Sequence, residues 1–250
     1  MHLEKQLTDM AIAYGWDYCG FADLTRYHTY MSSFCGPFIK QFPRAVSLVI
    51  RLSNAIVDSI EEQEQDKILS FHNYNYYAID YLQNTGTARI ANYLERNGWM
   101  AYPVPASYGV YQEKLAALIS HKLVARAAGL GWIGKNGLFL TPREGPRVRL
   151  ASILTDAPLE TAQPMESACR NCQICRLACP AEAIKGREFN EGEADYERLD
   201  PAKCLDFIEN RKKEWGIEIE RCVCGLCVVV CPFGRKMPSG QQRSSDRNGA

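Results

Sequence analysis

The stretch CRNCQICRLACP, residues 169–180, decides the organisation of this chain. A second run, CGLCVVVCP, spans residues 224–232, and nine of the eleven cysteines lie between Cys169 and Cys231. Disulfides are one explanation, but disulfide frameworks are typical of small secreted domains. The N-terminus lacks the basic and apolar regions of an export signal. Clustered thiols in such a chain more often hold metal.

The first run has the C-x2-C-x2-C-x3-C-P spacing of bacterial ferredoxins. Three thiolates on one tight loop can bind three corners of a 4Fe–4S cubane, while the fourth, Cys179, is directed toward a second cluster. Zinc is the alternative, but zinc sites favour two separated cysteine pairs. We therefore expect two iron–sulfur clusters and a ferredoxin-like domain that transfers single electrons.

The second run lacks its fourth cysteine, because the expected position is Arg221 and Cys222 misses it by one residue. Cys204 is the better candidate, since an inserted loop can bring a remote thiol to the open corner. Cys222 remains the alternative, and Cys19 and Cys35 are most simply buried thiols. Crossed ligation predicts one ligand set of Cys169, Cys172, Cys175 and Cys231. It predicts a second set of Cys179, Cys204, Cys224 and Cys227.

The overall composition is that of an ordinary globular protein, with 46% hydrophobic residues. The 29 basic residues balance the 29 acidic ones, which argues against binding nucleic acid through bulk charge. No apolar run approaches the ~18 residues that cross a bilayer. We therefore expect a cytoplasmic protein with neither a membrane nor a nucleic-acid partner.

The pattern of apolar residues predicts an α+β fold in two domains, 1–162 and 163–237, and a disordered polar tail, 238–250. Helices are expected near residues 3–14, 66–96 (with a break near Thr85 and Gly86) and 112–128. Strands are expected near residues 45–52, 99–104, 137–141 and 148–155.

The segment GLGWIGKN, residues 129–136, satisfies G-x-G-x-x-G and nearly satisfies G-x-x-x-x-G-K-[ST]. Both nucleotide-binding motifs need a strand before the glycines and a helix after them, whereas the order predicted here is reversed. Asn136 also replaces the hydroxyl residue. NAD and ATP are therefore disfavoured. A structural turn and a backbone close to a flat ligand both remain open.

Residues 128–137, together with GPRVRL at 145–150 and LTDAPL at 154–159, resemble epoxyqueuosine reductases and reductive dehalogenases. The similarity covers roughly residues 100–235. It implies a nitroreductase-like N-terminal domain that binds base-off cobalamin between the glycine loop and the clusters. The residues that it assigns to this cofactor are Gly129, Gly131, Trp132, Gly134, Lys135, Asn136, Gly137 and Arg147.

Epoxyqueuosine reductases carry an acidic proton donor before the glycine loop, but this chain reads PASYGVY at residues 105–111. Dehalogenases often use a tyrosine in this region, so Tyr108 and Tyr111 are candidate donors. His121 is a third. A packing or surface role is an equal alternative for each. Epoxyqueuosine reductases also continue into a helical-repeat domain that this sequence lacks, which argues against tRNA as substrate.

The leading hypothesis is a cobalamin-dependent iron–sulfur reductase. A low-potential donor of the ferredoxin or flavodoxin type would reduce the clusters, which would reduce cobalt and then a small organic substrate. One alternative is an electron-transfer protein that reduces a corrinoid held by another protein. The other is a flavin-binding reductase of the same fold.

Overall fold

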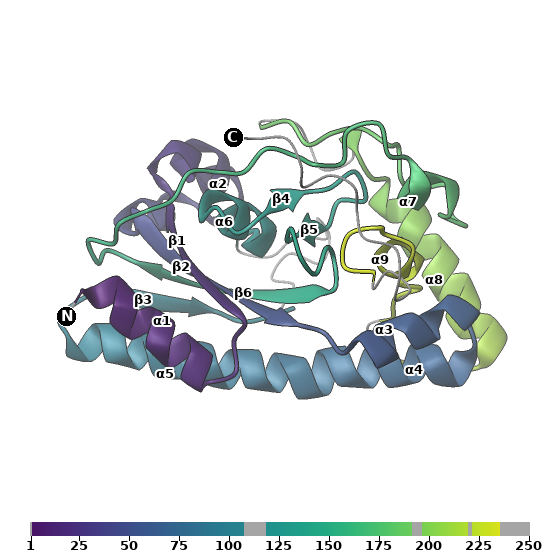
Figure 1. The fold of residues 1–250 in the computed structure, drawn as a ribbon, viewed down its shortest axis with the longest axis horizontal. Coiled ribbons are helices and arrows are strands. Elements are labelled where there is room, and N and C mark those ends of the chain that lie inside the picture. The colour runs from purple at the N-terminus through teal and green to yellow at the C-terminus, as the bar shows by residue number, and fades with distance from the viewer. Residues whose placement is uncertain (1, 108–118, 192–196, 220–221, 236–250) are drawn as a thin grey trace, which may run out of the picture.

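A four-stranded antiparallel sheet, in the order β1-β2-β6-β3, forms the centre of the N-terminal part, by which we mean the predicted domain 1–162 (Figure 1). The computed structural model describes residues 2–107, 119–191, 197–219 and 222–235. The strands are β1 (Tyr18–Asp23), β2 (Arg44–Arg51), β3 (Ala101–Val104) and β6 (Val148–Thr155). The central strands β2 and β6 are buried on both faces, which is why they appear in the sequence as nearly continuous apolar runs.

Helices cover both faces of this sheet. On one face α1 (Leu3–Ala13) and α5 (Asp80–Arg96) enclose a core that includes Val46 and Leu48. On the other face α6 (His121–Ala127) packs against β1, β2 and β6, with Val124 beside Ala45. The shorter helix α2 (His28–Cys35) lies between β1 and β2 in the chain.

The predicted helix over 66–96 forms, but the expected break near Gly86 is wrong. The irregular part is a π-helical segment, η4 (Tyr74–Ile79), which joins α4 (Gln65–Asn73) to an uninterrupted α5. A Cβ at Gly86 would lie 3.0 Å from Nε1 of Trp16, so this glycine serves close packing inside the helix. Figure 1 shows α4 and α5 as one long rod beneath the sheet, with α3 (Asn54–Ser59) beside α4.

The cysteine-rich part, by which we mean the predicted domain 163–237, lies at one end of the sheet (Figure 1). It contains α7 (Ile174–Leu177), α8 (Pro201–Trp215) and α9 (Leu226–Val229). The insertion that carries Cys204 is a 15-residue helix, α8, rather than the loop we expected. Its start follows a familiar rule: Asp200 caps the N-terminus by accepting a hydrogen bond from Lys203 N, and Pro201 follows. The hairpin of β4 (Trp132–Ile133) and β5 (Phe139–Leu140) contains the second half of the glycine segment.

The remaining expectations have mixed outcomes. The strand predicted at 148–155 is confirmed to the residue, whereas β1 was not predicted. The start of the helix expected at 112–128 and the polar tail both lie outside the described residues, as do Tyr108 and Tyr111. The domain boundaries at 162 and 237 stay predictions. In the part of the chain that the structure describes, no helix is long and apolar enough to span a membrane.

Gly145 and Gly234 allow the backbone near Phe233, in the cysteine-rich part, to pass close to the backbone near Glu144, in the N-terminal part. A Cβ at Gly234 would collide with the carbonyl oxygen of Glu144, and a Cβ at Gly145 would collide with that of Phe233. Both glycines have positive φ, +82° and +56°. Next to this close approach, Nη2 of Arg235 donates to both carboxylate oxygens of Glu61, at 2.9 and 3.0 Å. The backbones are therefore in direct contact where the two parts meet.

We expect Gly234→Ala to lower the free energy of unfolding by about 3 kcal/mol, because it adds a backbone collision to an unfavourable φ. Gly216→Ala is the matched control, since Gly216 has φ +64° but nothing within 4 Å of its Cβ position. That change should cost about 1 kcal/mol, the backbone effect alone. Urea denaturation of both variants checks this, and equal losses would contradict it.

Candidate iron–sulfur site

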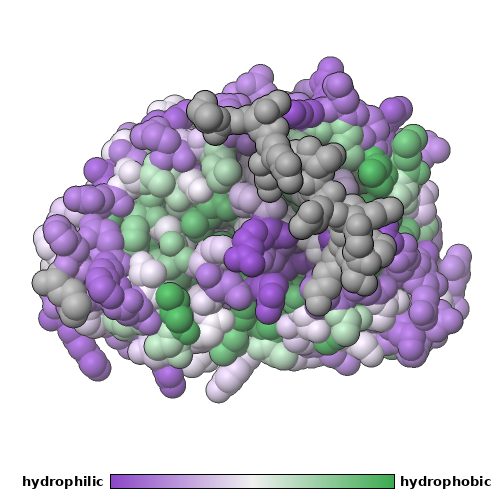
Figure 2. All heavy atoms as spheres, in the orientation of Figure 1, coloured by the Kyte–Doolittle hydropathy of each residue, from purple (hydrophilic) through white to green (hydrophobic). Residues whose placement is uncertain are grey.

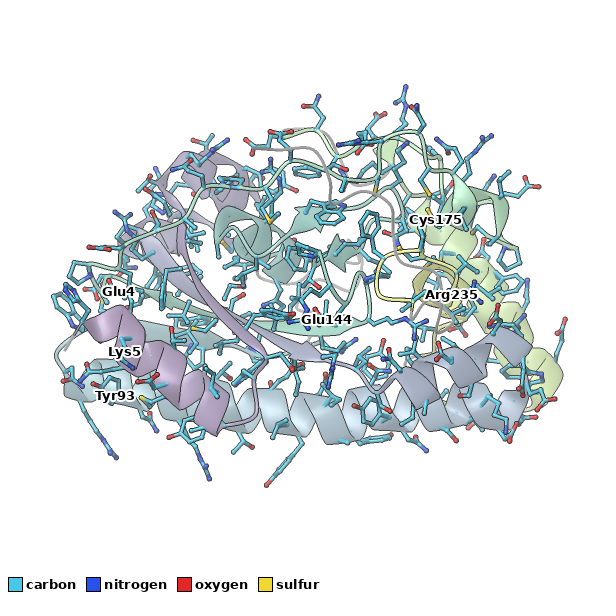
Figure 3. All side chains as sticks on the ribbon, viewed as in Figure 1. Glu4, Lys5, Tyr93, Glu144, Cys175 and Arg235 are labelled. Atoms are coloured by element: carbon cyan, nitrogen blue, oxygen red, sulfur yellow. The ribbon has the colours of Figure 1, made fainter. Side chains whose placement is uncertain are left out.

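Four thiols of the first predicted ligand set line one cavity. These are Cys169, Cys172, Cys175 and Cys231, and the same cavity is lined by Lys135, Asn136, Leu140, Pro232 and Phe233. Figure 3 labels Cys175, which comes from α7 and lies close to the α9 segment. Burial raises the pKa of Cys231 to about 12, and the nearby thiols of the other three cysteines add to the shift. These four cysteines, from positions far apart in the chain, are therefore neighbours.

The second predicted set also consists of neighbours. Burial first, and then the thiols of Cys224 and Cys179, raise the pKa of Cys204 to about 11. The pKa of Cys227 is raised well above its usual value by burial and then by Cys224, Cys204, Cys175 and Cys179. The influence of Cys175 on Cys227 shows that the two sets lie next to each other.

Cys222 differs from Cys204 in its surroundings. It packs against the main hydrophobic core, and its sulfur lies 4.0 Å from the carbonyl oxygen of Val223. Burial raises its pKa, and among the described thiols Cys224 adds to the shift. Cys204 has two such neighbours, including Cys179 from the first run. The geometry therefore favours Cys204 as a ligand.

The donor chemistry fits 4Fe–4S clusters. Burial and the neighbouring thiols make it costly to ionise these cysteines, and bound iron offsets that cost because it takes thiolates as ligands. Among the described residues, no three His, Cys, Asp or Glu side chains are grouped so that they could share a single metal ion. The first set instead surrounds a cavity. We therefore assign the two sets to two clusters as a prediction from geometry.

The loop between β4 and β5 joins the N-terminal part to both cysteine runs. Lys135 Nζ donates a hydrogen bond to the carbonyl oxygen of Arg170, inside the first run. Asn136 Nδ2 donates to the carbonyl oxygen of Cys227, inside the second run, at 3.2 Å. Both side chains are about 95% buried. This loop therefore helps to position the ligands of both clusters.

The glycines of the loop are in contact with protein atoms. A Cβ at Gly131 would collide with the carbonyl oxygen of Leu140, and a Cβ at Gly129 would lie 2.8 Å from that of Gln163. At Gly134 it would lie 2.6 Å from the Leu140 side chain and 3.5 Å from Cys169 Sγ. Internal packing is enough to require glycine at these positions. Their assignment to a cofactor pocket stays a prediction, as does that of Gly137 and Trp132.

Arg147 is a predicted cofactor residue whose buried guanidinium has unused hydrogen-bonding capacity. Its side chain is 1% exposed, and Nη1 contacts Asn54 at 3.1 Å and Asp58 at 2.6 Å. Nε and Nη2 have no hydrogen-bond partner among the described residues. These two atoms form one edge of the guanidinium, the edge that binds carboxylate or phosphate in a two-pronged manner.

His121 anchors the segment that leads to Tyr108. Its Nε2 lies 3.4 Å from the carbonyl oxygen of Pro105, which can only accept, so Nε2 carries the proton and Nδ1 accepts from Ser152 Oγ at 2.9 Å. Burial lowers the pKa of His121 to about 4. The ring is therefore neutral at pH 7 and engaged at both nitrogens. As a proton source for catalysis His121 stays a prediction that this geometry does not favour.

Sequence analysis missed a polar network on the same segment. Asp80, 6% exposed, accepts hydrogen bonds from Arg149 at 2.9 Å and from Ser107 at 3.2 Å. Asn84 Oδ1 accepts from Ala106 N at 2.9 Å. The sequence does contain a signal for this network, because Asp80 falls on the apolar face of the predicted helix. A carboxylate at such a position needs a partner.

Comparisons with known proteins agree with the cysteine geometry. Residues 168–234 match the family model of the 4Fe-4S double cluster binding domain. The epoxyqueuosine reductase of Synechococcus sp. (strain RCC307) is 33% identical over 179 residues, 64% of this chain and 53% of the relative. The tetrachloroethene reductive dehalogenase of Desulfitobacterium hafniense is 31% identical over 160 residues, 59% of this chain and 26% of the relative. The chain thus spans about half of the first relative and a quarter of the second.

Solved structures of both families share the fold. An epoxyqueuosine reductase in complex with a tRNA-Tyr epoxyqueuosine-modified stem loop superimposes with a TM-score of 0.55 at 20% identity, covering 93% of this chain and 65% of that one. A reductive dehalogenase whose structure is described as suggesting a mechanism for B12-dependent dehalogenation has a TM-score of 0.64 at 19% identity. It covers 92% and 31% of the two chains.

The tRNA complex corrects one expectation. We predicted from the balanced net charge that nucleic acid is not a partner, and that prediction is wrong. A relative with the same fold binds a tRNA stem loop. Net charge averages over the whole surface, whereas a nucleic-acid contact depends on local groups. It therefore cannot exclude such a partner.

Cys204→Ser should reduce the iron content of anaerobically reconstituted protein from about eight to about four atoms per chain, because one cubane loses a ligand. Cys222→Ser is the matched control and should leave about eight. Iron analysis and electron paramagnetic resonance spectra measure both. Loss of a cluster in Cys222→Ser with retention in Cys204→Ser would reverse the assignment.

The domain match spans all eight cysteines that the spacing selected. The sequence and structural similarities reach beyond that domain into the sheet and its helices. The chain therefore carries a 4Fe–4S double cluster binding domain and is related, in sequence and in fold, to the epoxyqueuosine reductases and the reductive dehalogenases.

Proposed function

We propose that the chain is an iron–sulfur oxidoreductase that holds two 4Fe–4S clusters and binds cobalamin beside them. The observation that carries the proposal is the grouping of eight thiols into two adjacent sets of four. Adjacent clusters allow an electron to pass from one to the next. Relatives of the chain are named as reductases and reductive dehalogenases, which are oxidoreductases.

Support for cobalamin comes from the B12-dependent relative and from Arg147. The free guanidinium edge of Arg147 would bind an acidic group such as the phosphate of cobalamin. Bound cobalamin would supply a cobalt centre that accepts electrons from the clusters and passes them to a substrate. The glycine loop adds no support of its own, because protein atoms occupy the space beside its glycines.

Proton delivery is assigned to the segment after Ser107. Hydrogen bonds from two helices hold residues 105–107, through His121 of α6 and through Asn84 and Asp80 of α5. This anchoring fixes the position of Ser107, the last described residue before Tyr108 in the chain. Tyr108 and Tyr111 remain the candidate donors. His121 has the supporting role of orienting Pro105.

Two substrate classes follow from the relatives: an epoxide-containing nucleoside in a tRNA stem loop and an organohalide. A second candidate function is an electron carrier that reduces a corrinoid held by another protein. One observation favours it: the loop assigned to the cofactor instead packs against the cysteine-rich part.

Titration of the cluster-loaded protein with hydroxocobalamin should give a base-off absorption spectrum and a stable complex. Arg147→Gln should weaken the affinity at least about tenfold, the scale of one lost charge-assisted pair. Lys203→Gln, which removes an exposed cation, should leave it unchanged. Tight binding of flavin, NADH or ATP without cobalamin binding would contradict the proposal.

Tyr108→Phe should lower turnover about 10²-fold or more while leaving iron content unchanged, because it removes only the phenolic proton. The assay offers an epoxyqueuosine-modified tRNA stem loop and tetrachloroethene as separate substrates under anaerobic reduction. Tyr111→Phe is the paired variant. If neither substrate is converted and a separate corrinoid protein is reduced instead, the chain is an electron carrier.

A further inference from the structure

Lys135 places a buried cation in the wall of the first cysteine cavity. Its side chain is 6% exposed and lines the same space as Cys169, Cys172, Cys175 and Cys231. The ammonium group donates a hydrogen bond to the carbonyl oxygen of Arg170, which lies between two of these thiols in the chain. The family resemblance implies that this lysine belongs to a cofactor loop, but in the structure it lines the first cluster site.

The charge on Lys135 is only partly balanced by protein groups. The nearest carboxylate is that of Glu188, at 3.7 Å, and its side chain is 42% exposed to solvent. A buried ammonium without a close counter-charge is costly. Four cysteine thiolates in the same cavity supply the missing negative charge once they hold a cluster.

Trp132, close to Cys231, carries a hydrogen-bond donor without an acceptor among the described residues. This donor is the buried indole N–H. The ring shares a small hydrophobic cluster with Cys231 and lies edge-on to Phe233 at 5.0 Å, and Cys169 packs against this cluster. Cys169 and Cys231 belong to the first ligand set, so sulfur atoms of a cluster bound there would be acceptors close to this ring.

We propose that Lys135 and Trp132 raise the reduction potential of the cluster held by Cys169, Cys172, Cys175 and Cys231. The inference rests on that ligand set and does not require cobalamin. Reduction adds one negative charge to the cluster, so a buried cation and an N–H donor stabilise the reduced form more than the oxidised form. Charge and hydrogen bonds to sulfur are the known determinants of cluster potential.

An exposed cation near the same cluster provides the internal comparison. Arg176 follows the ligand Cys175 directly, but its side chain is exposed. Solvent and salt screen its charge, whereas they have little access to Lys135. The two residues carry the same charge at the same cluster and differ in burial.

The test uses the full chain with both clusters reconstituted and no cobalamin. Redox titration followed by electron paramagnetic resonance measures both midpoint potentials. Lys135→Met should lower one of them by about 59 mV or more, a tenfold change in the one-electron equilibrium. Lys135→Arg and Arg176→Gln should each change that equilibrium less than about threefold, because the first keeps the buried charge and the second removes a screened one. Trp132→Phe should lower the same midpoint.

Each outcome bears on the proposal. Loss of one cluster in Lys135→Met with retention in Lys135→Arg also supports it, because the two variants differ in charge. Unchanged midpoints, an equal shift in Arg176→Gln, or loss of the cluster in both Lys135 variants would overturn it. An unchanged midpoint in Trp132→Phe would remove the tryptophan from the proposal. Since cobalamin is absent, failure here is distinct from failure of the cobalamin assignment.

Discussion

Two hydrogen bonds from neighbouring residues of one buried loop hold the cysteine-rich part in place. Lys135 binds the carbonyl of Arg170 and Asn136 binds that of Cys227, so each residue fixes one cysteine run. The runs are separated by more than forty residues in the chain, and α8 lies between them. The relative position of the two cluster sites therefore depends on a loop that belongs to the N-terminal part.

The elements that the sequence predicted well are those set by local chemistry. Cysteine spacing predicted seven of the eight ligands because a cubane imposes its geometry on nearby residues, and the structure brings the cysteines of each predicted set together. β2 and β6 were found because central strands buried on both faces need continuous apolar runs. β1 was missed because its strand, YCGFAD, has partly exposed positions and a glycine. Helix α8 was not predicted, although Asp200 and Pro201 at its start are N-terminal helix signals.

The glycine loop shows what a sequence pattern cannot distinguish. Glycine is required wherever another atom occupies the space of a Cβ, and the sequence does not say whether that atom belongs to a ligand or to the protein. At Gly131 it is the carbonyl oxygen of Leu140, across the β4–β5 hairpin. His121 poses the same difficulty, since its two hydrogen bonds depend on Pro105 and Ser152, which only the fold brings to it.

The crossed arrangement of the cysteines has a consequence for biosynthesis. Cys231 completes a set begun at Cys169, and Cys179 joins a set that ends at Cys227, so each set draws on both runs. A ribosome that has released only the first run has produced three-quarters of one site and one-quarter of the other. With the predicted ligand sets, complete ligation of either cluster would have to wait for the second run, and for the first set until residue 231 has been translated.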